Sequence, residues 1–282
     1  MTRQQKKTLK MALSYLVIVL IGCLLLFPIA WMISCAFKTN EEIFGSIALL
    51  PKSFSIQNFV DGWKSAGSYT YLTYFLNSFA LVVPTTVLTI ASSALVAYGF
   101  ARFEFPFKKQ LFALLLATLM LPNSVVIIPR YVLFNKFGWV DSYMPWWVPA
   151  ILACYPFFIY QLIQFMRSIP RDLDESAYID GCSTFRVFWQ ILLPLMKPAL
   201  FSAGLFQFLW TYNDYFNSLI FINSVKKYTI SLALRLSVDA ESVVVWGRVM
   251  AMACVAVLPL VLLFFAAQKY FVEGIATSGL KG

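Results

Sequence analysis

The distribution of charge constrains this chain more than any other sequence feature. Six long stretches contain no Asp, Glu, Lys or Arg, with one exception, Asp214. They are residues 11–37, 65–101, 110–129, 142–166, 198–225 and 249–268. An α-helix needs ~20 residues to cross the hydrocarbon core of a membrane. The sequence therefore predicts an all-α integral membrane protein with six transmembrane helices.

The overall composition agrees with a lipid-facing exterior. Only 12% of the 282 residues are charged and 60% are hydrophobic, whereas soluble domains carry about 25% charged residues. The five cysteines form no disulfide framework by their spacing, and without histidine we expect no metal site. The first stretch follows a basic N-terminus as a signal peptide would, but its 27 residues exceed the ~7–15 of a signal core. We expect it to remain as the first span.

The basic residues predict how the chain is oriented. Six spans place both termini on one side, and the segments on that side hold 13 of the 22 Lys and Arg residues. Loops in the cytoplasm carry an excess of Lys and Arg. We therefore expect both termini in the cytoplasm. The segments outside are then residues 37–71, 130–143 and 223–247.

The longest polar stretch on the predicted cytoplasmic side is residues 167–198. Ser168 could cap a first helix that begins with three acidic residues, and Gly181 would end it with a positive φ. Ser183 or Thr184 could cap a second helix over residues 185–193, in which Phe185, Phe188, Trp189 and Leu192 recur at helical spacing. Pro194 should stop that helix.

Three interpretations of this helix–glycine–helix loop compete. It could lie flat along the lipid headgroups, or it could form a knob on which a cytoplasmic protein docks. A DNA-reading helix-turn-helix has a similar outline, but Asp172, Asp174, Glu175 and Asp180 would repel phosphate. The residue chemistry leaves the first two interpretations open.

The spacing within the loop resembles a known signature. The residues are Glu175-Ser176-Ala177, then Gly181 after three residues, then Ile191-Leu192-Leu193-Pro194 after nine more. This resembles the Glu-Ala-Ala-x3-Gly-x9-Ile-x-Leu-Pro loop of permease subunits of bacterial ABC importers, in their carbohydrate-uptake branch. The one departure is Ser176 in place of alanine.

The resemblance implies a type I ABC importer permease fold and a division of the chain. Residues 1–71 would hold the cytoplasmic N-terminus, the first span and an extracellular segment. Residues 72–269 would form the transmembrane core with a coupling loop at 167–198, and residues 270–282 a cytoplasmic tail. The docking residues implied for an ATPase subunit are Glu175, Ser176, Ala177, Asp180, Gly181, Ile191 and Pro194.

The same resemblance implies partners and a location. The chain would work in the bacterial cytoplasmic membrane with a second permease, two ATP-binding subunits and an extracellular solute-binding protein that delivers a sugar. ATP and Mg²⁺ would be bound by the ATPase rather than by this chain. The sequence agrees, because the glycines at 274 and 279 are followed by Leu280 before Lys281, whereas a phosphate-binding loop needs its lysine directly after the second glycine. We therefore expect a transport subunit without enzymatic activity of its own.

Asp214 is the one acid within an otherwise uncharged span. Such a residue costs ~2.5–3.5 kcal/mol at mid-membrane and usually faces a bundle interior or a water-filled path. Its polar and aromatic neighbours suit a sugar, and in the carbohydrate permeases a Trp-Asn-acid-aromatic run often lies here. The predicted path residues are Tyr212, Asn213, Asp214 and Asn217. Alternatively, Asp214 bonds neighbouring helices or pairs across a permease interface.

Two other functions fit the sequence less well. An ion-coupled secondary transporter usually carries more spans and more buried ionisable residues. An importer of a glycerol-phosphate-type or other polar solute would need a cation to neutralise phosphate, and no basic residue lies within the uncharged stretches. The sequence therefore favours a neutral oligosaccharide.

Overall fold

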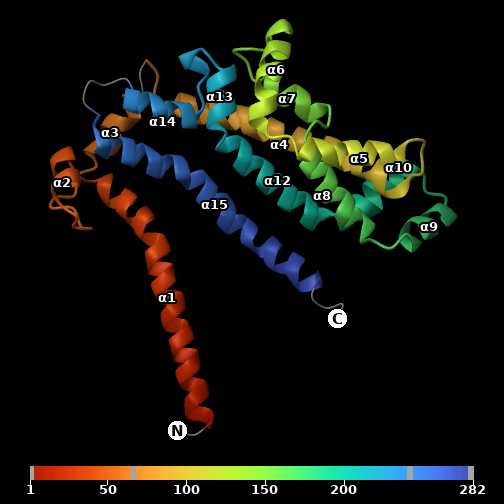
Figure 1. The fold of residues 1–282 in the computed structure, drawn as a ribbon, viewed down its shortest axis with the longest axis horizontal. Helices are drawn as coiled ribbons and strands as arrows, with labels where there is room; N and C mark the ends of the chain where they lie inside the picture. Colours follow the sequence, from red (N-terminus) through yellow and green to blue (C-terminus); the bar gives the residue numbers. More distant parts are fainter. Residues whose placement is uncertain (1–2, 65–67, 240–243, 279–282) are drawn as a thin grey trace. The chain divides into compact units, whose positions relative to one another are not determined.

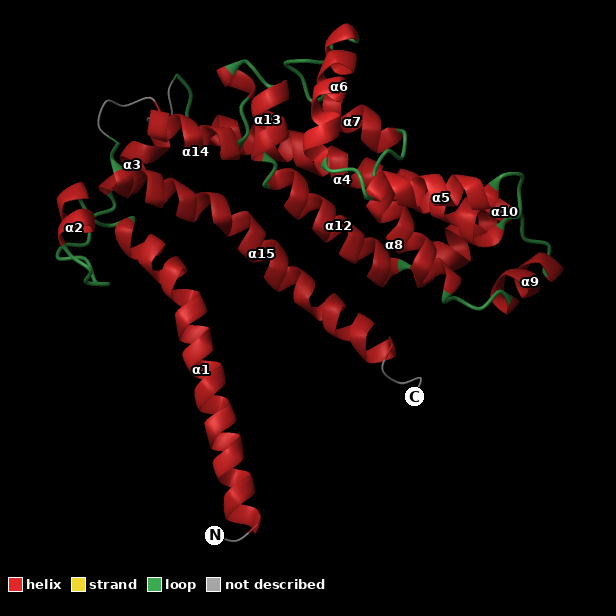
Figure 2. Cartoon of the chain, viewed as in Figure 1, coloured by secondary structure: helices red, strands yellow, loops and turns green. Residues whose placement is uncertain are grey.

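The chain is helical throughout the part that can be described. The computed structural model describes residues 3–64, 68–239 and 244–278, and within these ranges it contains helices and loops but no extended strand (Figure 2). The predicted features at Gly279 and Lys281 lie outside the described residues. The all-α prediction is confirmed.

The chain divides into two compact units. The first comprises residues 1–71 and 234–258, and the second comprises residues 72–233 and 259–282. The first unit contains α1 (Arg3–Cys35), α2 (Asn40–Gly45) and α3 (Gln57–Lys64). Two helices continue from one unit into the other, α14 (Ile230–Asp239) and α15 (Trp246–Ser278).

The second unit holds the remaining elements (Figure 1). They are α4 (Tyr71–Arg102), α5 (Lys108–Leu119), α6 (Asn123–Lys136), α7 (Met144–Ile151), α8 (Pro156–Arg167), α9 (Asp172–Ile179), α10 (Thr184–Arg186), the π-helix η1 (Val187–Leu192), α11 (Leu193–Leu195), α12 (Lys197–Tyr212), α13 (Tyr215–Phe221) and the 3-10 helix η2 (Val225–Lys227).

By length and composition, the described helices supply four membrane crossings, or up to six if each bent pair is one span. Four are long and apolar enough without a bend, namely Lys10–Cys35, Tyr71–Arg102, Met144–Arg167 and Trp246–Ala267. Two more arise if each bent pair is one span: α5 with α6, bent by 103°, and Thr184–Leu195 with α12, bent by 75°. The prediction of six spans is confirmed in this form.

The bends have local causes. Pro122 stands directly before α6; it has no N–H for the carbonyl four residues earlier, and it disfavours helical geometry at Leu121. The predicted span at 198–225 is also interrupted, because α12 ends at Tyr212 and Asp214 caps α13 with its carboxylate. Asp214 therefore lies at a helix break and not inside a continuous helix, contrary to the sequence prediction.

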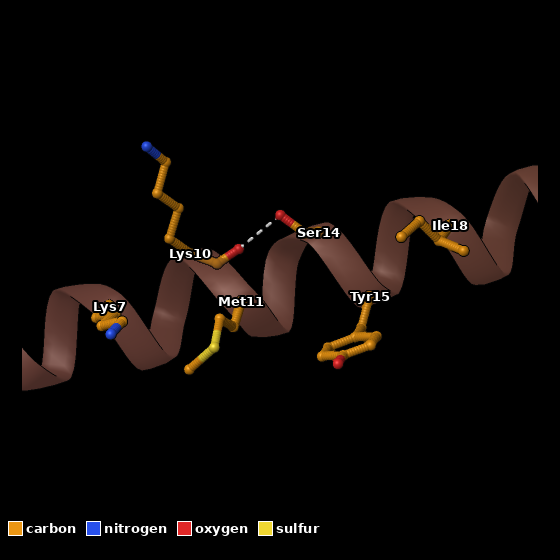
Figure 3. Close-up of a pocket in the computed structure, with 6 residues that line it drawn as sticks. All are labelled: Lys7, Lys10, Met11, Ser14, Tyr15 and Ile18. Atoms are coloured by element: carbon orange, nitrogen blue, oxygen red, sulfur yellow. Dashed lines mark hydrogen bonds between the residues drawn. The ribbon is translucent and has the colours of Figure 1, made fainter. Parts of the chain in front are cut away.

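Helix α1 exposes its apolar surface on every side. In its most apolar window, none of the described residues is buried within the chain. Figure 3 shows one face near its start, where Lys7 and Lys10 are followed by Met11, Tyr15 and Ile18, and where Ser14 Oγ donates to the Lys10 carbonyl at 2.9 Å. A change from lysines to apolar side chains along one helix face is typical of a membrane interface.

The segment after α1 is held by asparagine side chains. Asn58 Nδ2 donates to the carbonyls of Ala36 and Lys38 at 3.0 and 2.9 Å. Asn40 accepts from the Trp246 N–H at 2.8 Å and donates to the Val244 carbonyl at 2.6 Å. These bonds fix residues 37–64 of the first unit against the start of α15.

The main core of the second unit joins the ends of three spans to the loop after α8. Buried residues of α4, α8, η1 and α12 pack into one cluster, and α8 lies against both α5 and α12. Small residues line the α4 and α12 faces, including Ala94, Ala97, Ala101, Ala199 and Ala203. Small side chains let helices approach closely where lipid supplies no hydrophobic drive.

Candidate functional site

Helix α9 carries Glu175, Ser176 and Ala177 of the signature and ends in a glycine corner. Gly181 has a φ of +81°, which glycine adopts without steric cost. The Gly181 N–H donates to the Tyr178 carbonyl at 3.0 Å and the Cys182 N–H to the Ala177 carbonyl at 2.9 Å. This pair of bonds is a Schellman motif, which satisfies the last carbonyls of a helix. The predicted positive φ is confirmed.

Helix α9 has one buried and one exposed face. Asp174 and Ala177 are buried, and Ala177 belongs to the main core. The exposed face carries Glu175 and Ser176, and Asp180, directly after the helix, is exposed as well. Figure 1 shows α9 projecting beyond the ends of α5 and α8 within the second unit. The corner therefore offers two carboxylates, a small hydroxyl side chain and an exposed glycine to whatever lies beyond it.

A buried ion pair holds α9 to the end of α4. Arg102 Nε lies 2.6 Å from Asp174 Oδ2, and the two side chains are only 6% and 9% exposed. Arg102 also donates to the Ile169 carbonyl at 3.1 Å. Burial raises the pKa of Asp174 above its ordinary value, and Glu175 adds to this, while Arg102 and Arg171 oppose it. This pair could not be predicted from the sequence, because its members are far apart in the chain.

The second half of the loop is embedded in the bundle. Ser183 Oγ accepts from the Arg186 N–H at 3.4 Å, which confirms the predicted cap. Phe188 is 2% exposed and stacks on Tyr98 with ring centroids 4.9 Å apart. Leu192 is buried in the same cluster. The Tyr98 hydroxyl donates to the Thr184 carbonyl at 3.0 Å, so α4 holds this segment at both Thr184 and Phe188.

Three details of the predicted loop are wrong. Ser168 ends α8 and bonds back to the Phe165 carbonyl at 2.7 Å, while α9 starts at Asp172 without a side-chain cap. Pro194 does not stop the second helix. It lies within α11, after a π-helical turn that accommodates its missing N–H, and the chain bends before α12.

The third detail concerns the aromatic residues of the second helix. Phe185 and Trp189 are 68% and 63% exposed, so they do not share the buried face of Phe188 and Leu192 that the helical spacing of the four residues predicted. Ile191 is half-buried against the main core and Pro194 is exposed. The loop thus has a rigid base made of Phe188 and Leu192 and a surface made of α9 and the Phe185–Trp189 pair.

A second polar site forms around Asp214. Its Oδ1 accepts from the Asn217 N–H at 3.1 Å and from Asn217 Nδ2 at 2.8 Å. Its Oδ2 accepts from the indole N–H of Trp146 in α7 at 3.2 Å. Asp214 therefore both caps α13 and bonds a neighbouring helix, as one of the sequence alternatives required.

Arg130 completes this cluster and was not among the path residues predicted from the sequence. One guanidinium nitrogen donates to Asn217 Oδ1 at 2.6 Å and to Asn123 Oδ1 at 2.9 Å. The sequence placed Arg130 in an outer connection, but it lies within α6, half of a bent pair. The expectation that no cation enters the spans is therefore wrong for this helix. Asn217 bridges the guanidinium and the carboxylate.

The other two predicted path residues point elsewhere. Tyr212 is buried and stacks on Phe208 with centroids 5.8 Å apart. Asn213 is exposed and bonds back to the Leu209 carbonyl at 2.9 Å. Of the four predicted residues, the structure brings Asp214 and Asn217 together and adds Arg130, Asn123 and Trp146.

The fold and the anchored corner define a class of protein: a polytopic helical permease with a helical loop at one end of its spans. Comparison with known families agrees. Residues 90–277 match the family model of the inner membrane component of binding-protein-dependent transport systems. The chain belongs to this family of inner membrane proteins.

Curated relatives match over nearly the whole chain. A probable ABC transporter permease, YurM of Bacillus subtilis, is 36% identical, covering 91% of this chain and 84% of the relative. The trehalose/maltose transport system permease MalG of Thermococcus litoralis is 30% identical over 99% of both chains. The arabinooligosaccharide transport system permease AraQ of Bacillus subtilis is 31% identical over 93% of both.

The fold is also that of a solved importer chain. A chain from a bacterial ABC transporter involved in the import of the acidic polysaccharide alginate superposes with a TM-score of 0.82. The match covers 96% of this chain and 99% of the other, at 17% identity. The predicted ABC importer permease fold is confirmed.

Proposed function

We propose that this chain is a membrane-spanning subunit of an ATP-driven oligosaccharide importer and that the corner Glu175–Gly181 docks on a cytoplasmic ATPase subunit. The observation that carries the docking proposal is the division of α9. Its outer face is exposed and acidic, while Ala177, Asp174 and the following helix are fixed to the span ends. Because its base is fixed in this way, a displacement of the corner Glu175–Gly181 by a partner moves the ends of the spans as well.

The mechanism follows from that rigidity. The carboxylates of Glu175 and Asp180 suit basic groups on a partner, and Gly181 leaves the backbone open to close approach. When two ATPase subunits close around ATP and Mg²⁺, the corner moves with them, and the buried contacts of Phe188 and Arg102 carry the motion into α4 and α8. A partner drives such a change only by binding one state more tightly than the other.

An oligosaccharide is the substrate class that the relatives favour. Relatives alignable over almost the entire chain are named for trehalose and maltose and for arabinooligosaccharides. In such an importer this chain forms the path with a second permease, and a solute-binding protein delivers the sugar from outside. Both termini lie in the cytoplasm in this arrangement.

The path passes the Asp214 cluster in this proposal. Asp214, Asn217 and Arg130 supply acceptors and donors at a helix break, where backbone groups are already bonded by side chains. Tyr212 and the exposed Asn213 directly precede Asp214 in the chain and form the edge of the proposed path. Sugar hydroxyls can exchange with such neutral and charged partners.

One observation favours the second candidate, an importer of a phosphate-bearing solute such as a glycerol phosphate. Arg130 brings a guanidinium to the cluster, and guanidinium groups pair well with phosphate. Asp214 on the other side of Asn217 offsets that charge. Uptake assays with a neutral oligosaccharide and with glycerol 3-phosphate separate the two substrates.

Substitutions at Gly181 test the docking proposal. Within this chain a β-carbon at Gly181 meets no atom within 4 Å, so the positive φ is the only internal constraint. We expect Gly181→Asn, which tolerates this φ, to keep most activity. Gly181→Asp places a third carboxylate on the corner and should abolish sugar uptake and ATPase co-purification while the protein stays in the membrane. Normal uptake and co-purification in Gly181→Asp would overturn the proposal.

A further inference from the structure

A basic cavity lies where α4 ends and the loop after α8 begins. Its volume is about 480 Å³, within the ~300–1,000 Å³ range of small-molecule sites. A second cavity of about 450 Å³ adjoins it and shares three of its lining residues. The charged residues that line the two cavities are Arg102, Glu104, Lys108, Lys109, Arg167 and Arg171.

The cations in these cavities outnumber the carboxylates that pair with them. Arg102 is paired with Asp174, and Lys108 Nζ lies 2.9 Å from Glu104 Oε1. Lys109, Arg167 and Arg171 form no ion pair with a carboxylate in the described part of the chain. Three positive charges are therefore left at one end of the spans.

The remaining cations line the two adjoining cavities: Arg167 lines both, Arg171 lines the first and Lys109 lines the second. Lys108 holds the pKa of Glu104 below its ordinary value, and Arg171 and Lys109 both contribute to that effect. Arg167 lies over the Phe112 ring at 5.1 Å from its centroid. Arg171 donates to the Ala101 carbonyl at 3.3 Å. The two arginines come from the loop side of the cavity and Lys109 comes from α5.

The start of α5 adds to the positive potential. This helix of 12 residues begins with two lysines and has no acidic residue in its first turn. The N-terminus of a helix is its positive end, so lysines there are unfavourable and an anion is favourable. Helix α9 shows the opposite arrangement, with three acids in its first turn. A bound anion at the start of α5 would offset the positive charge of the helix end and its two lysines, which no acidic residue in the first turn of α5 offsets.

An apolar groove lies along the same helix, α5, from Leu111 onward. Its volume is about 640 Å³, and it runs between the end of α4, one face of α5 and the start of α8. Leu111, Leu114 and Leu115 line it, one and two helical turns beyond the lysines. The basic cavities and the groove thus follow one helix from the predicted membrane surface into the hydrocarbon region.

We propose that this end of α5 binds one anionic phospholipid, with its phosphate at Lys109, Arg167 and Arg171 and an acyl chain along Leu111–Leu115. Charge complementarity selects an anionic headgroup, since basic pockets between transmembrane helices on the cytoplasmic side bind such headgroups. A free phosphate would satisfy the cations but would leave the groove unused.

Lipid retention by the purified complex tests the proposal. The full transporter is equilibrated with equal phosphatidylglycerol and phosphatidylcholine in detergent, and the bound lipids are counted by native mass spectrometry. We expect the complex to retain phosphatidylglycerol preferentially. The double variant Arg167→Gln/Arg171→Gln should bind it roughly 30-fold more weakly, at about fivefold for each cation near the membrane surface. Unchanged retention in the double variant would overturn the proposal.

Two further arms sharpen the result. The control Lys136→Gln/Lys226→Gln removes the same charge from exposed lysines elsewhere in the chain. It should bind the lipid as the wild type does. An equal loss of binding in this control would show that only net charge matters and would contradict a defined site. The exposed Lys109→Gln, which guards against misfolding of the arginine variant, should weaken binding by about fivefold. Displacement of the lipid by excess inorganic phosphate would assign the cations to free phosphate and refute the lipid.

Discussion

At the scale of single residues, Asp214 has two separable tasks. Its side chain caps α13, and its charge lies beside Asn217 and the Trp146 indole. Asparagine is also a good N-cap, whereas loss of the cap to alanine costs about 0.5–2 kcal/mol. The cap and the charge can therefore be removed one at a time.

We predict that Asp214→Asn keeps the thermal stability of the wild type but lowers sugar uptake, and that Asp214→Ala lowers both. Asn135→Ala, an exposed amide on α6 that is not part of the proposed path, is the control. The measurements are a melting curve in detergent and initial uptake rates in vesicles. If Asp214→Asn takes up sugar at the wild-type rate, the carboxylate has no role in the path and its role is structural.

Asp141 joins the loop between α6 and α7 to the loop after α13, and its carboxylate makes this contact sensitive to acid. It accepts from the Ser224 N–H at 2.8 Å, from the Asn223 N–H at 3.0 Å and from Lys227 Nζ at 3.0 Å. Partial burial alone would raise the pKa of Asp141, but these hydrogen bonds outweigh it and hold the pKa well below its ordinary value.

A depressed carboxyl pKa stabilises the fold above the unfolded value, about 3.9, and this contribution is lost as the pH falls through the folded pKa. We therefore predict that Asp141→Asn is less stable than the wild type at pH 7 and that the difference shrinks below about pH 4. Melting curves of the wild type and Asp141→Asn at pH 7 and below about pH 4 test this. The exposed Glu41→Gln is the control. A difference that stays constant with pH would contradict the role of the charge.

At the scale of elements, the buried Arg102–Asp174 pair decides whether α9 stays fixed to α4. Removing one member of a buried pair typically costs 3–5 kcal/mol, because the other charge is left buried without a partner. Replacing both with apolar residues of similar size often restores stability.

We predict that Arg102→Met and Asp174→Leu each loosen the loop by about 3–5 kcal/mol and that the double variant recovers much of this. Limited proteolysis at residues 167–183 and coupled ATPase rates measure the effect. Additive losses in the double variant would mean that the two side chains do not act as a pair.

The same elements show how far the sequence could predict the loop. Gly181 and Ser183 were predictable, because a positive φ and a helix cap are local properties of glycine and serine. Ser168 was misassigned because a serine caps the end of one helix as readily as the start of the next. Arg102, Tyr98 and Arg130 were missed because their partners lie far away in the chain. Two sequence signals were available for the arginines. Arg102 is a cation at the end of a predicted span, and Arg130 is a cation that follows a span ending in a proline.

At the scale of the whole molecule, the chain is a family member whose spans are interrupted where its polar residues gather. The breaks at Pro122 and Asp214 place Arg130, Trp146 and Asn217 together, while the unbroken part of α4 and the buried base of the loop form the main core. Discontinuous helices are the usual means of presenting polar groups at membrane depth. The exposed α9 corner and the polar cluster are thus joined within one unit.

The most direct test of the account is contact between the corner and the ATPase. The photoreactive residue p-benzoylphenylalanine, placed at Glu175 or at Asp180, should form a covalent adduct with the ATPase subunit when membranes holding the full transporter are illuminated. The same residue at the exposed Lys136 should not. Adducts from positions 175 and 180 that change in yield with ATP are the predicted result. An intact complex that yields no ATPase adduct from either position would contradict the account.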